Sequence, residues 1–367
     1  MSLWLLILLP VIAIALLEIV ARIYHRIKYL VPFHSKVIGE YPYSHFLETI
    51  NAPLFFRFKK NFHSPMVNLN RLRCRGPEPA PDGEKKRILV IGESNLFGVK
   101  LQKEEELWSI ILQGLLDERM PGQWEVLNAG NPGYNSNQHL ELWRTELKNS
   151  KPDILIAAMG GNDIAIASLK GSQWQPGAPW PLDFIMALER KSPWWNKLLN
   201  RFCFYFLWRR LKKGPVHSSF SPAENGVPRE ACQQNLKNNF RALISEAREM
   251  GAKVACTFYA PAADYDLDQR SQRQVESIQA NWRETLETRT SFDLQLLQYL
   301  KEDICPELEL PYIDLYSEFR NHPKRFEMYF DLAHWNQRGM PLVAQTFLRE
   351  LENLGWLSKS ADQFGEA

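Results

Sequence analysis

The sequence predicts an α/β fold in which one parallel sheet carries helices on both of its faces. Short apolar runs alternate along the chain with longer stretches of helical periodicity, as in strands joined by helical crossovers. The first run, residues 88–91, is β-branched or leucine throughout, which is typical of a strand buried on both faces. Strands are expected at 88–91, 124–129, 154–159, 253–259 and 312–315.

Helices are expected between these strands and after the last one. In the first of them Leu107, Ile111 and Leu115 fall on one stripe, as in a helix that packs against a core. Gly251 and Gly355 follow the third and fifth helices and are expected to end them. The expected helices cover 104–119, 136–148, 236–247, a long polar stretch at 268–304, and 340–351.

The composition excludes several classes of protein. Of the 367 residues, 45% are hydrophobic, which is ample for a packed core. The 44 Lys and Arg residues nearly balance the 42 Asp and Glu residues, so no nucleic-acid partner is indicated. The 5 cysteines are scattered without a CxxC pair, and therefore neither a zinc ribbon nor a disulfide framework is predicted.

Residues 1–23 are predicted to form a transmembrane anchor. The run 3–21 is apolar except for Pro10 and Glu18, and as a helix it would measure about 28 Å, close to the thickness of a bilayer core. No basic residue precedes the run, which favours an uncleaved anchor over a signal peptide; a core or interfacial helix is the alternative. The basic residues all follow the run, which by itself places the rest of the chain in the cytoplasm.

The remaining chain divides into three parts. Residues 24–85 are predicted to be a juxtamembrane segment that partly packs on the main domain, ending in a linker at 76–85 (GPEPAPDGEK). The main domain covers 86–358, and 359–367 form a tail. An aromatic-rich insert at 164–228 interrupts the alternation of strands and helices. It is interpreted as a helix packed on the domain, a lid or substrate wall, or a membrane-surface contact.

Three short polar blocks follow the first three strands. The first is Gly92-Glu93-Ser94, which is not a GxSxG elbow because residue 96 is Leu. The second, 128–133, ends in Gly133, whose N–H can face the edge of the sheet without a Cβ in the way. The third, 160–163, contains Asn162, whose side-chain NH₂ can donate to a developing oxyanion. Taken alone, each block is also explained by a turn or a helix cap.

The fourth block, residues 331–336 (DLAHWN), lies just before the last helix. Asp331 and His334 are three residues apart and can share one face of a turn. The carboxylate can then accept from the imidazole, which leaves the other ring nitrogen free as a base. The pair could also be two ligands of a metal site, but no third ligand stands at a telling spacing.

The order of these four blocks resembles the SGNH, or GDSL-type, serine hydrolase family over residues 87–354, with 164–228 poorly matched. The resemblance implies a flavodoxin-like, three-layer α/β/α fold with a five-stranded parallel sheet. It implies hydrolysis of esters or thioesters without a metal or organic cofactor. Ser94 would be the nucleophile, His334 the general base and then acid, and Asp331 the residue that orients it. The N–H groups of Ser94 and Gly133 and the side chain of Asn162 would form the oxyanion hole.

Some features depart from the family or extend its pattern. Glu93 stands where family members usually have Asp, which questions how the carboxylate braces the serine turn. Asp163 and Asn336 also match, and we expect them to support loops. Look-alikes with an N-terminal span act outside the cytoplasm on acylated envelope glycans or lipids, which opposes the charge rule above, and we expect the catalytic domain to be extracytoplasmic. A non-catalytic glycan- or lipid-binding protein and an O-acyltransferase remain as alternatives.

Overall fold

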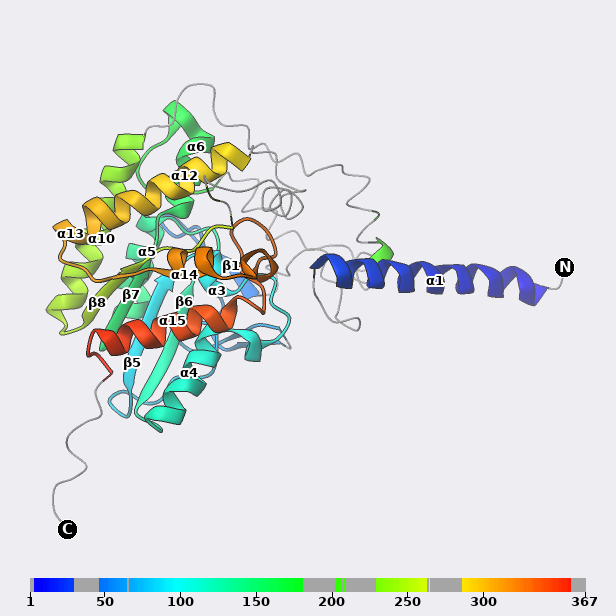
Figure 1. The fold of residues 1–367 in the computed structure, drawn as a ribbon, viewed down its shortest axis with the longest axis horizontal. Helices are drawn as coiled ribbons and strands as arrows, with labels where there is room; N and C mark the ends of the chain where they lie inside the picture. Colours follow the sequence, from blue (N-terminus) through cyan, green and yellow to red (C-terminus); the bar gives the residue numbers. More distant parts are fainter. Residues whose placement is uncertain are drawn as a thin grey trace, which may run out of the picture.

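A computed structural model of the chain describes residues 3–29, 46–64, 66–180, 202–205, 208, 229–262, 264 and 286–357. Its centre is a five-stranded parallel sheet with the order β6-β5-β7-β8-β9 (Figure 1). In chain order this is 2-1-3-4-5, the flavodoxin-like arrangement. The predicted sheet is therefore confirmed. Its strands are β5 (Lys86–Gly92), β6 (Trp124–Gly130), β7 (Ile154–Ala158), β8 (Lys253–Thr257) and β9 (Tyr312–Ile313).

The register of the three central strands brings their carboxyl ends to one level. Gly92, the last residue of β5, pairs with Gly130 of β6 on one side and with Ala158 of β7 on the other. The chain therefore leaves all three strands at the same edge of the sheet. This is the edge at which open α/β sheets bind ligands, and it is where the first three polar blocks begin.

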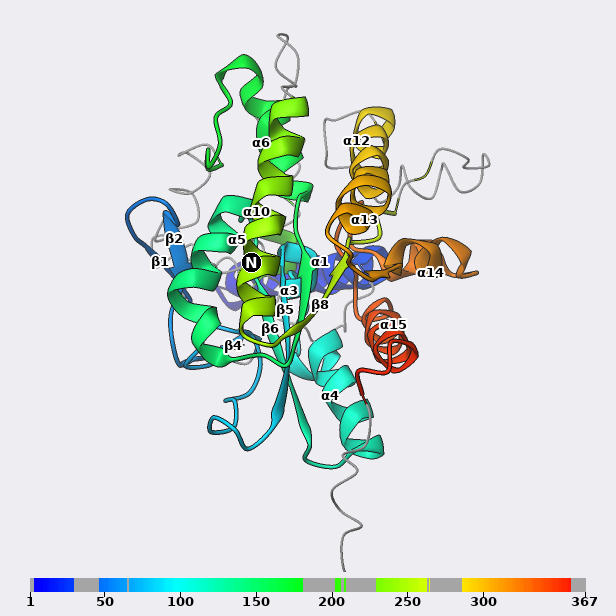
Figure 2. The same cartoon turned by 90° about the vertical axis from the view of Figure 1, so that its left-hand side faces the viewer.

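Helices cover both faces of the sheet, as predicted. Figure 2 shows α5 and α10 on one side of the sheet and α4 and α15 on the other. Leu107 has extended backbone (φ −71°, ψ 138°), so the expected helix 104–119 is split at this buried residue into a 3₁₀ turn and α4. Gly251 and Gly355 follow their helices with positive φ, as expected. The helices of these layers are α4 (Trp108–Arg119), α5 (Ser136–Leu142), α10 (Arg229–Glu249) and α15 (Met340–Asn353).

Shorter helical segments connect the layers. α5 continues as a π turn, η2 (Trp143–Leu147), and a 3₁₀ turn, η3 (Lys148–Ser150). Of the expected polar helix at 268–304, the part before residue 286 lies outside the described residues. The other helical segments are α3 (Ser94–Phe97), η1 (Glu104–Glu106), α6 (Gly161–Lys170), η4 (Gly171–Gln173), α12 (Leu286–Tyr299), η5 (Leu300–Ile304), α13 (Cys305–Glu307), α14 (Leu315–Asn321) and η6 (Arg325–Met328).

The N-terminal residues form one long helix, α1 (Leu3–Tyr29). Within the described parts of the chain, no helix combines the length and apolar character that crossing a membrane requires. The predicted transmembrane anchor at 1–23 is therefore not supported. Its polar residues are engaged within the protein: Glu18 pairs with Arg22 at 2.7 Å and accepts the N–H of Phe204 at 3.2 Å.

The part of the predicted juxtamembrane segment that precedes the linker contacts the main domain. It forms two small hairpins, and their aromatic side chains join the main core: the ring of Phe58 lies 4.9 Å from that of Phe97. Arg75 forms an antiparallel bridge with Asn128 of β6. Strands of two or three residues are too short to show a period in the sequence. They are β1 (Leu47–Thr49), β2 (Phe56–Phe58), β3 (Phe62–His63) and β4 (Asn68–Leu69).

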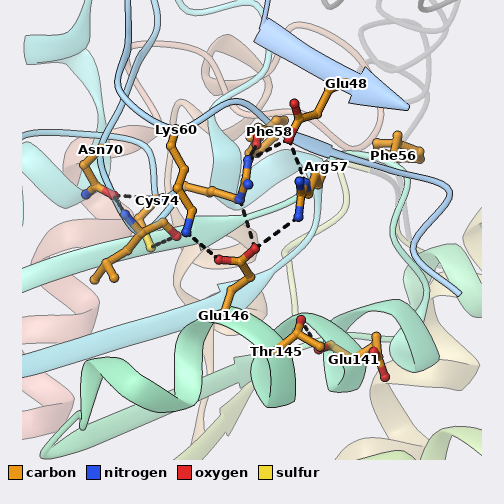
Figure 3. Close-up of polar contacts among 12 residues, drawn as sticks. Glu48, Phe56, Arg57, Phe58, Lys60, Asn70, Cys74, Glu141, Thr145 and Glu146 are labelled. Carbon is orange, nitrogen blue, oxygen red and sulfur yellow. Dashed lines mark hydrogen bonds and ion pairs between the residues drawn. The ribbon is translucent and has the colours of Figure 1, made fainter. Parts of the chain in front are cut away.

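An ion-pair cluster fastens these hairpins to η2 (Figure 3). Glu146 of η2 accepts from Lys60 at 2.9 Å, Arg73 at 3.2 Å and Arg57 at 3.4 Å. Glu48 binds two of the same cations. Burial alone would raise the pKa of Glu146, but Lys60 and Arg73 outweigh it and lower the pKa. The π turn thus holds a carboxylate against the segment that precedes the sheet.

Only part of the aromatic insert predicted at 164–228 lies within the described residues. Residues 164–180 are described and include most of α6 and the turn η4. Residues 181–201, 206–207 and 209–228 lie outside the described residues, and with them most of the insert. Cys203 is buried, and its Sγ lies 3.3 Å from the carbonyl oxygen of Ala21 in α1. This part of the insert therefore packs against the N-terminal helix.

Candidate active site

Ser94 stands at the start of α3, directly after the sharp turn that ends β5. This turn requires glycine at close approaches: a Cβ on Gly92 would lie 2.8 Å from the carbonyl oxygen of Ala158, and one on Gly130 would lie 2.3 Å from the nitrogen of Phe97. Because α3 sits so tightly on the strand ends, Ser94 is held at the edge where β5, β6 and β7 terminate.

Three buried donors hold the last carbonyls of α3. The indole of Trp108 and the amide of Asn128 both donate to the carbonyl of Leu96, at 2.7 and 2.8 Å. The guanidinium of Arg75 donates to the carbonyls of Phe97 and Gly98, at 2.9 and 2.8 Å. A helix of four residues satisfies few of its own carbonyls, so these contacts supply the missing partners.

The fourth block lies against the first. The Oγ of Ser94 and the Nε2 of His334 are 2.8 Å apart. The Nδ1 of His334 lies 2.8 and 2.9 Å from the two carboxylate oxygens of Asp331. These three side chains, expected from the sequence to act together, therefore form one continuous hydrogen-bonded chain. The carboxylate selects the tautomer in which Nδ1 carries the proton and Nε2 accepts from the serine.

Asp331 is held in one orientation by the turn that carries it. Its Oδ1 accepts the backbone N–H groups of Ala333 and His334, both at 3.0 Å. Its Oδ2 accepts from the side chain of Lys100. Burial by itself would raise the pKa of Asp331, but the neighbouring charges of His334 and Lys100 outweigh it and hold the pKa well below its usual range. The carboxylate is therefore ionised at neutral pH.

Glu93 braces the third block despite its extra methylene. Its Oε1 accepts the backbone N–H of Gly160 at 3.0 Å and of Asn162 at 2.9 Å. These donors lie at the N-terminus of α6, where helix N–H groups have no intrahelical acceptor. Glu93 thus ties the serine turn to the residues that follow β7.

Hydrogen bonds connect the three blocks that carry the residues expected to form an oxyanion hole. The amide Nδ2 of Asn162 donates to the carbonyl of Tyr134, the neighbour of Gly133, at 2.9 Å. That bond uses one of two amide hydrogens and leaves the second for another acceptor. Among the described residues, the N–H groups of Ser94 and Gly133 find no hydrogen-bond acceptor. Asn131 donates to the carbonyl of Gly92 at 2.7 Å, which ties this block to β5.

Asp163 and Asn336 hold loops. Asp163 accepts the N–H of Ser136 at 2.8 Å and its hydroxyl at 2.5 Å, joining α6 to the first residue of α5. Burial raises the pKa of Asp163 to about 6, against the opposing effect of the Ser136 hydrogen bonds. Asn336 is buried and donates to the carbonyl of Glu327 at 2.8 Å, which fixes the turn before α15.

His139 of α5 packs edge-on against Tyr134, with ring centroids 5.6 Å apart. Neither ring nitrogen has a hydrogen-bond partner in the described part of the chain, and burial lowers its pKa from 6.5 to about 3. The unfolded chain binds a proton below pH 6.5 that the folded chain does not bind until about pH 3. The stabilisation that neutral His139 provides is therefore complete above pH 6.5 and is lost as the pH falls.

We expect this residue alone to cost about 3 kcal/mol of stability at pH 4 relative to pH 7. The free energy of unfolding of His139→Phe, measured with urea between pH 7 and pH 4, should depend on pH less steeply than that of the parent protein. The difference should correspond to about one proton. His322→Phe is the control, because that ring is partly exposed. Equal pH slopes in His139→Phe and the parent protein would contradict the expectation.

No group of three or more His, Cys, Asp or Glu side chains with the geometry of a metal site occurs among the described residues. The Asp331–His334 pair is engaged with Ser94 and Lys100. The alternative in which this pair supplies two ligands of a metal therefore finds no third ligand in the described part of the chain.

Sequence reasoning missed three residues at this site. Lys100 contacts the carboxylate of Asp331, Arg75 holds the serine turn, and Tyr134 accepts from Asn162. Lys100 follows Gly98 in the loop after α3, but no spacing distinguishes it from a solvated lysine. Arg75 lies in a segment that reads as irregular, so nothing in the sequence connects it with residues 97 and 98.

No protein-family model matches this chain, and no curated protein does. Solved structures with a similar fold exist. A lipase/acylhydrolase from Enterococcus faecalis is 18% identical over 73% of this chain and 96% of its own, with a TM-score of 0.42. The psychrotrophic esterase EstA from Pseudoalteromonas sp. is 16% identical over 74% and 98%, with a TM-score of 0.40. TesA is 15% identical over 73% and 99%, also with 0.40. At these values, neither activity nor substrate can be carried over to this chain.

Proposed function

We propose that this protein is a serine ester hydrolase that works through an acyl-enzyme intermediate. The observation that carries the proposal is the continuous chain from the Oγ of Ser94 through His334 to Asp331, with contacts of 2.8 to 2.9 Å. A serine hydroxyl is a weak nucleophile until an adjacent base takes its proton. The base needs a fixed orientation and tautomer, and Asp331 supplies both.

The reaction follows from the positions of these atoms. His334 takes the hydroxyl proton of Ser94 as Oγ attacks the ester carbonyl, and the tetrahedral oxyanion forms. As the oxyanion collapses, the ester C–O bond breaks and His334 gives its proton to the leaving alcohol. A water molecule then attacks the acyl-serine with His334 again as base, which releases the acid and restores Ser94.

Three donors are proposed to stabilise the oxyanion. They are the N–H groups of Ser94 and Gly133, which have no acceptor among the described residues, and the second amide hydrogen of Asn162. Tyr134 and Glu93 fix Asn162 from two sides, through its side chain and its backbone N–H. Donors held in place before the reaction need no reorganisation when the charge develops.

Labelling by a fluorophosphonate probe tests the proposal. The full chain should be labelled at Ser94 and should cleave short p-nitrophenyl esters, and Ser94→Ala should be neither labelled nor active. Product analysis with and without an added acceptor sugar separates hydrolysis from acyl transfer, which uses the same side chains. Folded wild-type protein that is not labelled and cleaves none of these esters would remove the basis of the proposal.

Asn162→Ala is expected to lower kcat by about a hundredfold to a thousandfold, the usual cost of one oxyanion donor. The KM for a p-nitrophenyl ester should change much less, because the charge it stabilises develops only in the transition state. Asn137→Ala is a suitable control, because this neighbouring amide bonds to Asn235 and Asn239 instead. A kcat equal to that of the wild type would exclude Asn162 from the hole.

We further propose that the ester group belongs to a cell-envelope glycan or lipid and that α1 holds the protein against a lipid surface. Support comes from the large apolar side chains of α1, many of which are exposed by 45% or more. Binding of the full chain to phospholipid vesicles should be lost when residues 3–29 are removed. A phosphatase reporter fused after Ala367 tests an extracytoplasmic location, since it is active only there. Equal vesicle binding with and without α1 would contradict the proposed role of α1.

A further inference from the structure

Lys100 contacts the carboxylate at the far end of the triad. It lies in the turn after α3, 231 residues from Asp331 in sequence, and its ammonium group donates to the Oδ2 of that residue. The Asp331 side chain is only 6% exposed, whereas that of Lys100 is 45% exposed. The lysine thus reaches from the surface into the polar end of the site. It forms a second link between the loop that carries the nucleophile and the loop that carries the base.

The backbone of Lys100 gives an independent reason to regard the contact as specific. Its φ is +71°, in the left-handed region where the backbone of any residue other than glycine is strained. Glycine would adopt this turn without strain but could not reach Asp331. A strained backbone persists when other contacts over-determine it, and the ion pair with Asp331 is such a contact.

The groups that face Asp331 divide between its two oxygens. Oδ1 accepts the N–H groups of Ala333 and His334, whereas Oδ2 accepts from Lys100; the imidazole Nδ1 lies within reach of both. The charged partners of the carboxylate are therefore Lys100 and, when it is protonated, His334. A permanent cation on Oδ2 offsets part of the negative charge that the imidazole would otherwise feel.

We propose that Lys100 is a positioning residue of this site: it holds the carboxylate of Asp331 against His334 and offsets part of the negative charge of that carboxylate. The inference rests on the proposed function for its catalytic meaning. The contact itself exists whether or not an ester is the substrate. Lys100 touches no reacting atom and acts through Asp331.

The expected consequence is a displaced titration. Without Lys100, the full charge of Asp331 stabilises the imidazolium, so His334 should become protonated at a higher pH. A unit charge at this separation in partly solvated surroundings is worth about 0.5 to 1 pH unit, and the exposure of the lysine favours the lower figure. The acid limb of kcat/KM should move upward by the same amount, because only the neutral ring can accept the proton of Ser94.

Two measurements on the full chain test this. Nuclear magnetic resonance of protein carrying ¹³C-labelled histidine gives the titration midpoint of His334 directly, with His334→Ala identifying its signal. The pH profile of p-nitrophenyl acetate cleavage gives the acid limb of kcat/KM. Both midpoints should rise in Lys100→Met and in Lys100→Gly. The glycine variant also relieves the strained turn, so a shift in that variant cannot be attributed to a damaged backbone.

Two variants serve as controls. Lys100→Arg keeps the charge and should leave both midpoints near those of the wild type. Lys103→Met removes a charge three residues away, on a side chain that pairs with Glu105 at 3.7 Å, and should also leave them in place. Unchanged midpoints in Lys100→Met and Lys100→Gly, or an equal shift in Lys103→Met, would overturn the inference. If the wild type cleaves no ester but the resonance shift appears, the proposed function fails and the role of Lys100 stands.

Discussion

Ser94→Ala and His334→Ala are each expected to lower kcat by about a millionfold, and the double variant is expected to lose no more than either single one. In the proposed mechanism Ser94 and His334 act as one unit: without the hydroxyl there is no nucleophile for the base to activate, and without the base the hydroxyl stays protonated. Their 2.8 Å contact is the structural basis for this coupling. The residual rate should reflect binding and the oxyanion donors alone.

Steady-state cleavage of a p-nitrophenyl ester by purified full chain measures the effect, with thermal unfolding to show that each variant folds. Ser245→Ala is a matched control, because this exposed serine lies on α10, away from the site. Additive losses in the double variant would show that the two residues act independently and would contradict the triad. A decrease in kcat of only a fewfold in either single variant would also contradict the triad.

Arg75→Met is expected to lower the free energy of unfolding by about 3 to 5 kcal/mol, the usual cost of breaking a buried ion pair from one side. The Arg75 side chain is fully buried, and its guanidinium lies 3.0 Å from the carboxylate of Glu104. It also donates to three carbonyls, including those of Phe97 and Gly98 at the end of α3. Methionine fills similar space but removes every one of these donors, and Glu104 loses its cation.

The pH dependence of this loss is a second signature. Burial raises the pKa of Glu104 above its usual value even with Arg75 present, which opposes the rise. Without Arg75 the pKa should rise further, and protonation then removes the orphaned charge. A folded-state pKa above the unfolded value favours the fold more as the pH falls, so the cost of Arg75→Met should be smaller at pH 5 than at pH 8.

Urea unfolding at both pH values measures the loss. Arg71→Met is the matched control: Arg71 lies four residues away and pairs with Glu78 at 2.6 Å, but both side chains are well exposed. Breaking this surface pair should cost less than about 1 kcal/mol. Equal decreases in the free energy of unfolding in Arg71→Met and Arg75→Met would show that the buried pair stabilises the fold no more than the exposed pair does.

The sheet could be predicted from the sequence because the patterns that indicate its strands and helices are local. An apolar run such as 88–91 is long enough to predict a buried strand, and Gly251 and Gly355 end their helices where the chain requires positive φ. The first hairpin was not accessible: β1 and β2 have three residues each, and their side chains are buried by contacts with distant parts of the chain. The expected anchor at 1–23 rested on the apolar character and length of one run and on the lack of a basic residue before it, and none of these describes how Glu18 contacts Phe204.

The sequence by itself determined which chemical groups were available and in what order. Asp331 and His334 stand three apart in one turn, and Ser94, Gly133 and Asn162 each follow an apolar run that predicts a strand. These relations are short-range, so spacing reveals them. Only the tertiary structure decided how the groups are held: Arg75 beneath the serine turn, Glu93 on the start of α6, and Lys100 on Asp331. Such contacts join residues that chain spacing does not relate, because the packing of the sheet edge, and no local pattern, brings them together.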